Sequence, residues 1–543
     1  MTKKEHIHLA FLGIIASLLC FSATSFAQDE NTSSIVTRTE MEVSRVSGPG
    51  HEQSFYSDGF RYNQELDIFG ETRLEGCTTT LQMDLRSTDN HLIDSEHFSV
   101  RRFSYNVKDS RSDLTIGDYF ANFSQYSMNK GIIGVGHQLN LTDDPKDDQN
   151  YIRTTFGTFD GQWAYLFEDW FGGEVQNEPM DLYGGGVRVQ KAGDNYRIGI
   201  NSTFVGHDGT DSKRTTGTAY LQWVEALDWE YRIKKFKFTG DHAISFTTAK
   251  PVANDDTHMQ GQAHNIKFRG KALDCNWDGK FEMVDPDFST LAGSATPDRI
   301  RYYGKVSKKF GKKWKAHLIA NYYYDRINRR SELAARTTNR TLEAGINHYK
   351  AFNRKYMKIS ARYRRNDSKE EHNDSNNSSN RIKVSLSDKV FDLLKYGFNF
   401  ESVLQTNDVN STFKRDYLYS LKFSATQKIK ELTLGPSLFL GHRTSDNLTA
   451  GGHDKVNTLR LLLDGNFLEN RFGGSMAFID TNISNGVDSI SGIWDVFFER
   501  TFKKLNNAVF KIEFKVNDYG FSFDVPDSDY RETRLIASFN MKI

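Results

Sequence analysis

The residue types that carry enzyme chemistry are scattered along this chain rather than grouped. It contains 15 histidines among 543 residues, and none lies in a G-x-S-x-G or H-E-x-x-H context. A hydrolase needs a nucleophile or a metal beside a base. The acidic run Asp143–Asp148 lacks the glycine and the bidentate glutamate of a calcium loop, which favours a solvated external loop. We therefore expect no enzyme, with no catalytic residue, no metal site and no cofactor.

The most individual stretch of the chain is Gly117–Ser127, in which a Gly-Asp step follows the strand-like residues Leu114–Ile116. Glycine permits backbone conformations that other residues avoid. Gly117 and Asp118 are therefore predicted to bend a strand, either as an inward constriction or as a hairpin at the membrane interface.

The elements that would position these residues are long strands. Apolar and polar side chains alternate from Met357 to Arg364 and from Ala508 to Asn517, for example. A period of two indicates a strand with one apolar and one polar face. The segments last about ten residues, whereas strands of soluble proteins average about five or six. This length is typical of a tilted strand that crosses a membrane.

Thirteen such segments are readable in the second half of the chain, and their connections alternate in length. The segments begin near residues 300, 314, 339, 357, 381, 395, 413, 432, 457, 472, 492, 508 and 532. Tight connections are expected at 310–313, 351–356, 389–394, 427–431, 468–471 and 502–507. Looser polar ones are expected at 326–337, 365–380, 407–412, 443–456, 484–491 and 518–531. Short periplasmic turns that alternate with long external loops are typical of an up-and-down barrel in an outer membrane.

The first half is noisier, but strands are readable in nine places. They are 65–74, 78–85, 98–107, 131–140, 151–159, 182–189, 196–204, 236–246 and 266–273. The sequence therefore predicts an all-β protein, a transmembrane antiparallel barrel of about 22–26 strands, with both termini in the periplasm. The low-complexity run Asn366–Asn380 is expected to be a surface loop.

Composition supports this reading. Lys+Arg and Asp+Glu number 70 each, so the net charge is zero, which argues against a nucleic-acid partner. There are 8 prolines, as long uninterrupted β-ladders would select. One polar and one apolar strand face also explain why a membrane-embedded protein has a mean hydropathy of −0.61.

The N-terminus predicts export. Lys3 and Lys4 precede the apolar run Leu9–Cys20, and Ser25–Ala27 offers small residues around a cleavage site. We divide the chain into a signal peptide at 1–27, a periplasmic or lumenal segment at 28–64 that includes room for a first strand, and a barrel at 65–543. Export leaves Cys77 and Cys275, whose pairing the sequence leaves open.

Two sets of barrel residues follow from the alternation. Phenylalanines beside cations at the tight connections are expected to form an interface girdle: Phe310, Phe352, Phe391 and Phe502. Charged residues on the polar faces are expected to line the lumen with mixed charge and weak ion selectivity: Lys315, His317, Asp325, Lys358, Arg362, Arg364, Lys422, Arg460, Asp464, Lys511, Glu513 and Lys515.

The expected function is a porin-like barrel in the outer membrane of a Gram-negative bacterium. Lipid and the barrel-assembly machinery are its expected partners; the last segment, Leu535–Ile543, resembles the terminal strand of such barrels but ends in isoleucine. In size and strand number the chain resembles the MtrB-type barrels that sheath multihaem cytochromes. That resemblance implies an alternative function, as a scaffold for a periplasmic or lumenal protein such as a multihaem cytochrome.

Overall fold

Strands make up nearly all of the computed structural model. It describes residues 32–542 except 75, 91–92, 95–96, 143–148, 160–162, 164–181, 208–217, 252–255, 326–335, 372–374, 392, 408–411, 485 and 522–527. The predicted signal peptide therefore lies outside the described residues. No described helix is long and apolar enough to cross a membrane.

The strands follow one another along the chain and each pairs with its neighbours. They are β1 (Thr32–Ser47), β2 (Gly59–Leu74), β3 (Cys77–Thr88), β4 (Phe98–Lys108), β5 (Ser112–Ser124), β6 (Met128–Asn140), β7 (Tyr151–Phe159), β8 (Leu182–Ala192), β9 (Tyr196–His207), β10 (Thr218–Ile233), β11 (Phe236–Pro251), β12 (Thr257–Ala272), β13 (Cys275–Val284), β14 (Arg299–Phe310), β15 (Trp314–Asp325), β16 (Thr337–Tyr349), β17 (Lys358–Glu370), β18 (Ser375–Val390), β19 (Leu394–Asn407), β20 (Thr412–Ala425), β21 (Gln427–Ile429), β22 (Leu432–Asn447), β23 (Gly452–Phe467), β24 (Asn470–Asn482), β25 (Ser489–Phe502), β26 (Ala508–Phe521) and β27 (Tyr530–Lys542). The described connections contain three short 3-10 helices, η1 (His51–Gln53), η2 (Ala351–Asn353) and η3 (Lys503–Leu505).

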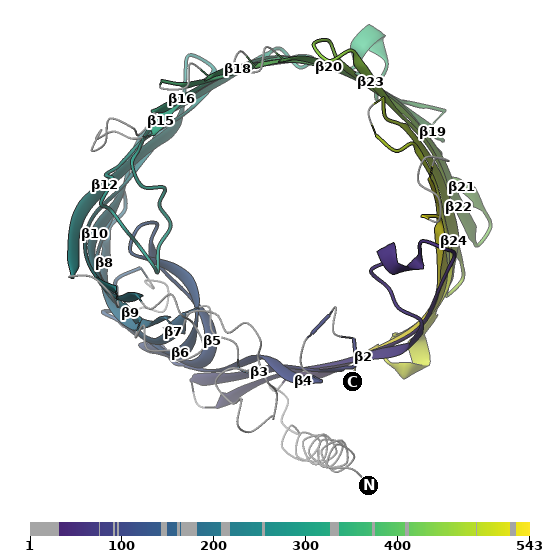
Figure 1. The fold of residues 1–543 in the computed structure, drawn as a ribbon. Helices are drawn as coiled ribbons and strands as arrows, with labels where there is room; N and C mark the ends of the chain where they lie inside the picture. Colours follow the sequence, from purple (N-terminus) through teal and green to yellow (C-terminus); the bar gives the residue numbers. More distant parts are fainter. Residues whose placement is uncertain are drawn as a thin grey trace.

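The ladder closes on itself. β1 pairs antiparallel with β2 on one side and with β27 on the other, from Val36↔Lys542 to Ser47↔Arg531. Figure 1 looks along the axis of the resulting ring. A closed ladder leaves no strand edge unpaired, which is the condition for crossing lipid with strands.

β20 and β21 are two parts of one strand, so the barrel has 26 strands. Both parts pair with β22 in one continuous register, and the interruption falls opposite Pro436. Proline has no N–H to donate to a ladder. The predicted all-β antiparallel barrel is therefore confirmed, at the upper end of the expected strand number.

The thirteen predicted segments of the second half correspond to thirteen strands, counting β20 and β21 as one, and the nine read in the first half are all present. The strands not read from the sequence are β5, β10 and β13, whereas β1 lies in the segment 28–64, where a possible first strand was expected. One boundary changes: the barrel begins at Thr32, since β1 and the start of β2 from Gly59 occupy most of the segment 28–64 that was set apart.

The connections at one end of the barrel are mostly short, as at 234–235, 273–274, 311–313 and 468–469. β1 starts and β27 ends at this short-turn end. The expected polar loop at 365–380 is wrong, because β17 and β18 stay paired as far as Glu370↔Ser375. Polar side chains tolerate this extension, since water can solvate both faces of a hairpin that reaches beyond the membrane.

The acidic run Asp143–Asp148 lies outside the described residues, but its attachment is clear. The flanking residues Leu141 and Asn150 share a backbone hydrogen bond of 2.8 Å between the end of β6 and the start of β7. Both flanking strand ends lie at the short-turn end of the barrel.

Besides the hairpin between β5 and β6, which is described below, two connections lie inside the ring in Figure 1. One is the connection 48–58, which contains η1 and packs against β27: Ser54 Oγ donates to Glu532 Oε1 at 2.6 Å, and the guanidinium of Arg534 lies 4.3 Å from the ring centre of Tyr56. The other is the connection between β13 and β14, at 285–298.

The inner segments identify the lumenal face of every strand. Val224, Ala226, Ala243 and Ala263 are buried beneath Phe288 of the inner connection, so they face inward. Because paired residues of neighbouring strands lie on the same face of the sheet, the register assigns the inward face of each further strand in turn. The outward positions hold many of the exposed apolar side chains, such as Leu461 on β23, as expected of a face that meets lipid.

Leu461 and Leu462 provide a matched test of the two faces. They are adjacent on β23 and equally accessible, at 40% and 41%, but alternation turns one outward and the other toward the lumen. We predict that Leu461→Arg destabilises the barrel by about 2–4 kcal/mol, whereas Leu462→Arg changes its stability by about 1 kcal/mol or less, because only the first buries a cation in lipid. Urea titration in lipid vesicles, read by heat-modifiable gel mobility, measures both; equal losses would contradict the assigned faces.

Candidate functional site

The candidate site is a hairpin that leaves the barrel wall and packs inside it. It consists of the outer parts of β5 and β6 with their connection, residues 118–132, and we call it the lumenal hairpin. β5 pairs with β4 only from Ser104↔Gly117 to Lys108↔Asp113, but with β6 along almost its whole length. Beyond Gly117, therefore, β5 leaves β4 but stays paired with β6.

Gly117 permits this departure. Its φ is +101°, and a Cβ added there would come within 2.1 Å of the carbonyl oxygen of Phe103. Only glycine adopts such a conformation without strain. The side chain of Asp118 replaces the lost ladder partner, since its Oδ2 accepts the backbone N–H of Phe103 at 2.7 Å and the indole N–H of Trp163 at 2.5 Å.

Hydrogen bonds fix the tip of the hairpin to the lumenal face of β11, β12 and β13. The backbone N–H of Gln125 donates to Asp241 Oδ2 on β11 at 2.8 Å, and its side-chain oxygen accepts from Asn265 on β12 at 2.7 Å. Tyr126 is fully buried and donates to Glu282 Oε1 on β13 at 3.3 Å. The tip thus spans three strands of the inner wall.

The inner connection 285–298, which we call the lumenal loop, covers the hairpin. Asn129 N–H donates to the carbonyl of Ala292 and Ser294 N–H donates to that of Gln125, both at 2.8 Å. The loop is also tied to the wall through Leu291 N–H, which donates to Gln222 Oε1 at 2.6 Å. Hairpin and loop are therefore bonded to each other as well as to the barrel.

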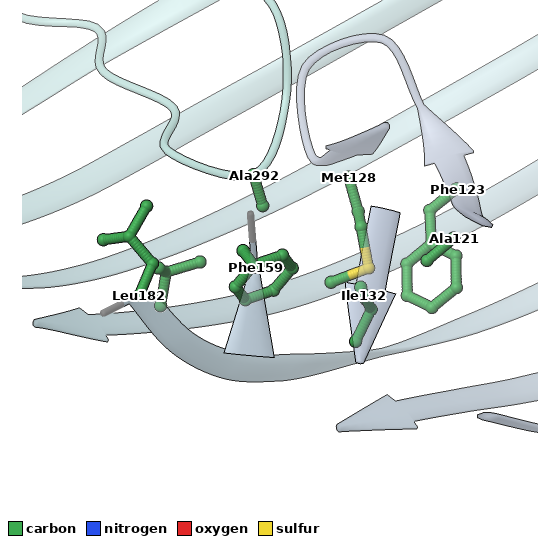
Figure 2. Packing of buried hydrophobic residues seen from close by; sticks show 8 residues of the cluster. Ala121, Phe123, Met128, Ile132, Phe159, Leu182 and Ala292 are labelled. Atoms are coloured by element: carbon green, nitrogen blue, oxygen red, sulfur yellow. The ribbon is translucent and has the colours of Figure 1, made fainter. Parts of the chain in front are cut away.

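Two apolar clusters lie beneath these segments. Figure 2 shows the first, in which Ala292 of the lumenal loop faces Met128 of the hairpin and Phe159 of β7. In the second, Tyr126 and Phe288 pack edge to face at 5.7 Å above small side chains of β10–β13. Burying each large side chain stabilises the packed arrangement by about 1.5–3 kcal/mol. These clusters are the parts of the lumenal face where a protein core replaces water.

A buried ion pair joins the hairpin to the wall. Arg188 on β8 makes a bidentate contact with Asp228 on β10, with Nη1–Oδ1 at 2.6 Å and Nη2–Oδ2 at 3.0 Å, and its side chain is 3% exposed. Its Nε donates to the hydroxyl of Tyr151 at 3.0 Å, and Nη1 also donates to the carbonyl of Phe123 on the hairpin. The guanidinium therefore bonds to the hairpin and to the wall at once.

The sequence drew attention to Gly117 and Asp118, and the structure places both where the hairpin leaves the wall. The sequence analysis did not single out Arg188, Asp241 or the lumenal loop. The loop does carry a signal, since the stretch Phe288-Ser-Thr-Leu-Ala-Gly-Ser-Ala between Pro286 and Pro297 has no charged residue and includes Phe288 and Leu291.

The other predicted site residues do not converge. The predicted lumenal residues all lie on the inward face by register, but they are spread over five strands, β15, β17, β20, β23 and β26. The predicted girdle residues lie at the short-turn end, where Phe352 and Phe391 are 78% and 94% exposed, and the cations of Lys308 and Arg500 lie 5.7 and 5.2 Å from the rings of Phe310 and Phe502. Cys77 and Cys275 are both free.

Comparison with known proteins gives structural similarity alone. No family model matches the chain, and no curated protein matches its sequence. Similar solved structures include the P pilus usher PapC translocation pore (10% identity, TM-score 0.39, 94% of this chain and 100% of that one). The outer membrane transporter YddB from Escherichia coli has 8% identity and a TM-score of 0.40 over 94% of this chain and 81% of that one. OccK2 from Pseudomonas aeruginosa, solved with glucuronate, has 10% identity and a TM-score of 0.30 over 95% and 99% of the two chains. At these values the similarity carries no argument about function.

The buried ion pair yields a test of how the hairpin is held. Arg188→Met leaves the Asp228 carboxylate buried without its cation, and we expect a loss of about 3–5 kcal/mol in the free energy of unfolding. The matched control is Arg471→Met, which breaks the exposed Arg471–Asp464 pair at 3.1 Å and should cost about 1 kcal/mol or less. Unfolding in urea, followed by tryptophan fluorescence, compares the two variants; similar losses would mean that Arg188 does not anchor the hairpin.

Proposed function

We propose that this protein forms a wide, water-filled channel across the outer membrane of a Gram-negative bacterium. The observation that supports the proposal most directly is the closed ring itself, with an apolar outer face and a polar, charged inner face. An inward face rich in charge is unfavourable against lipid or a dry core. It is stable when water fills the space that it surrounds.

The width of the ring supports a channel rather than a packed core. With strands about 4.8 Å apart and tilted by about 40°, a barrel of 26 strands measures roughly 50 Å between opposite backbones. In Figure 1 the described inner segments lie along the wall. We infer that the lumenal hairpin and lumenal loop narrow this space from one side.

Conductance tests this proposal directly. Purified protein in planar bilayers should conduct ions, and a barrel of this width should pass much more current than a small porin. A folded, inserted protein that carries no current would contradict the channel.

Replacing the lumenal loop tests the constriction. Val284 and Arg299, which flank the loop, are paired neighbours on β13 and β14, so a short Gly-Asn-containing turn can join them. Removing residues 286–297 should raise the single-channel conductance, because it frees lumenal volume and loosens the hairpin. A folded variant with unchanged conductance would show that the loop does not limit the flow of ions.

A second candidate function is a scaffold around another protein. The width of the ring favours it, since a barrel of this size can enclose a small folded domain. A multihaem cytochrome is the partner suggested by the similarity in size and strand number to the MtrB type. Affinity purification from the native host would support the scaffold if haem-absorbing protein co-elutes in fixed ratio, and a stable, haem-free, conducting monomer would contradict it.

A further inference from the structure

Although the net charge of the chain is zero, the lumenal wall contains a local group of cations. We propose that Arg362, Arg364, Arg381 and Lys383, which we call the basic quartet, bind solutes that carry two or more carboxylate or phosphate groups. This inference rests on the proposed channel only in so far as a solute must reach the lumen.

The quartet is brought together by register rather than by sequence. β17 and β18 place Arg364 directly opposite Arg381 and Arg362 directly opposite Lys383. Residues in such pairs have Cβ atoms about 5 Å apart, and successive residues on one face are about 7 Å apart. The four side chains therefore start from a patch of roughly 5 by 7 Å. All four share the inward face with Lys358 of β17.

The quartet has more positive charge than its surroundings neutralise. Arg381 Nε lies 3.3 Å from Glu401 Oε1, and Lys383 Nζ lies 3.2 Å from Glu401 Oε2, so these two cations share one carboxylate. Arg362 Nε lies 3.5 Å from Glu343 Oε1, which His317 Nε2 also contacts at 3.0 Å.

Arg364 is the cation that the wall leaves without a carboxylate. Glu343 stands opposite it in the ladder, but the contacts of Glu343 are with the two residues named above. Within the described part of the chain, Arg364 makes no ion pair, and its Nε donates to Asn366 Oδ1 at 3.1 Å. Four cations thus meet two carboxylates.

Such a group is unfavourable for folding by itself. Like charges directly opposite each other on a sheet are destabilising, and a serine or asparagine at these positions would line a watery lumen equally well. The side chains are also available, since those of Arg362, Arg381 and Lys383 are 55%, 49% and 45% exposed. Unneutralised, accessible cations at close spacing are what an anionic ligand requires.

The geometry favours a small polyanion over a protein surface. Guanidinium groups bind carboxylates and phosphates through two parallel hydrogen bonds, and here three guanidiniums lie within one patch. A stable protein interface needs about 800 Å² from each partner, far more than this patch. A solute with two or three oxyanion groups can instead contact several members of the quartet at once.

The test is titration calorimetry on the folded, detergent-solubilised full-length protein. Citrate supplies three carboxylates, pyrophosphate supplies phosphates, and acetate is the monovalent control. We expect saturable binding of one citrate or one pyrophosphate per chain and none of acetate. The preferred anion distinguishes the carboxylate from the phosphate source. Absence of saturable binding of both polyanions would overturn the proposal.

Arg364→Gln with Arg381→Gln removes two members of the quartet while leaving Glu401 paired with Lys383 and Glu343 paired with Arg362. We expect affinity to fall by about tenfold or more, the equivalent of one hydrogen bond to a charged group. The matched control is Lys315→Gln with Lys422→Gln, which removes the same charge from lumenal positions outside the quartet and should change affinity by about twofold or less. Equal losses of affinity in both variants would mean that the anion responds to the overall electrostatic potential of the lumen and not to the quartet, and would overturn the proposal.

Stability separates binding from a structural role. Because neutralisation relieves like-charge repulsion, the quartet variant should resist urea at least as well as the unmodified protein. Loss of folding together with loss of binding would mean that the quartet has a structural role in the barrel wall, and would overturn the proposal.

Arg364→Lys keeps the charge without the planar fork and should weaken binding by several-fold in a fully folded protein. Binding without conductance would retain the site and reject the channel, and conductance without binding would do the reverse.

Discussion

Closure of the backbone hydrogen-bond ladder is the constraint on which the rest of the molecule depends. Inside lipid, an unpaired N–H or C=O group costs several kcal/mol, so a sheet can cross only if it has no edge. Pairing of β1 with β27 meets that condition. It also explains the composition, because each long strand must satisfy lipid on one face and water on the other, and few prolines can be accommodated. The break between β20 and β21 lies opposite one of those prolines.

The lumenal hairpin shows how such a barrel can leave its own ladder locally. Where β5 departs at Gly117, backbone groups of β4 lose their ladder partners, and the Asp118 carboxylate accepts a hydrogen bond from one of them, the N–H of Phe103. The polar groups of the hairpin tip are then satisfied by Asp241 and Asn265 on the wall. A closed ring thus supplies both the framework and the anchors, which allows protein packing to replace water along one side of the lumen.

Charge is distributed more unevenly than its total suggests. Equal numbers of acidic and basic residues predict a lumen with little preference for either sign of ion. Register nevertheless gathers three arginines and a lysine on two adjacent strands, where the described part of the chain offers them two carboxylates. A neutral chain can therefore carry a local, strongly basic surface. The ion preference of the channel depends on where such groups meet the flow.

The fold class, most of the strands and the polar and apolar faces of those strands can be read from the sequence alone. This is possible because a period of two is a local property, and lipid on one side and water on the other impose it on every strand. Strands such as β10, where outward Glu225 interrupts the apolar face, and β5, which leaves the wall, were harder to read for the same reason. Which residues meet inside the barrel is a property of the folded chain. The contact between Gln125 and Asp241, the burial of Arg188 and the grouping of the basic quartet depend on register and on chain segments far apart in sequence, and neither is encoded in any local pattern.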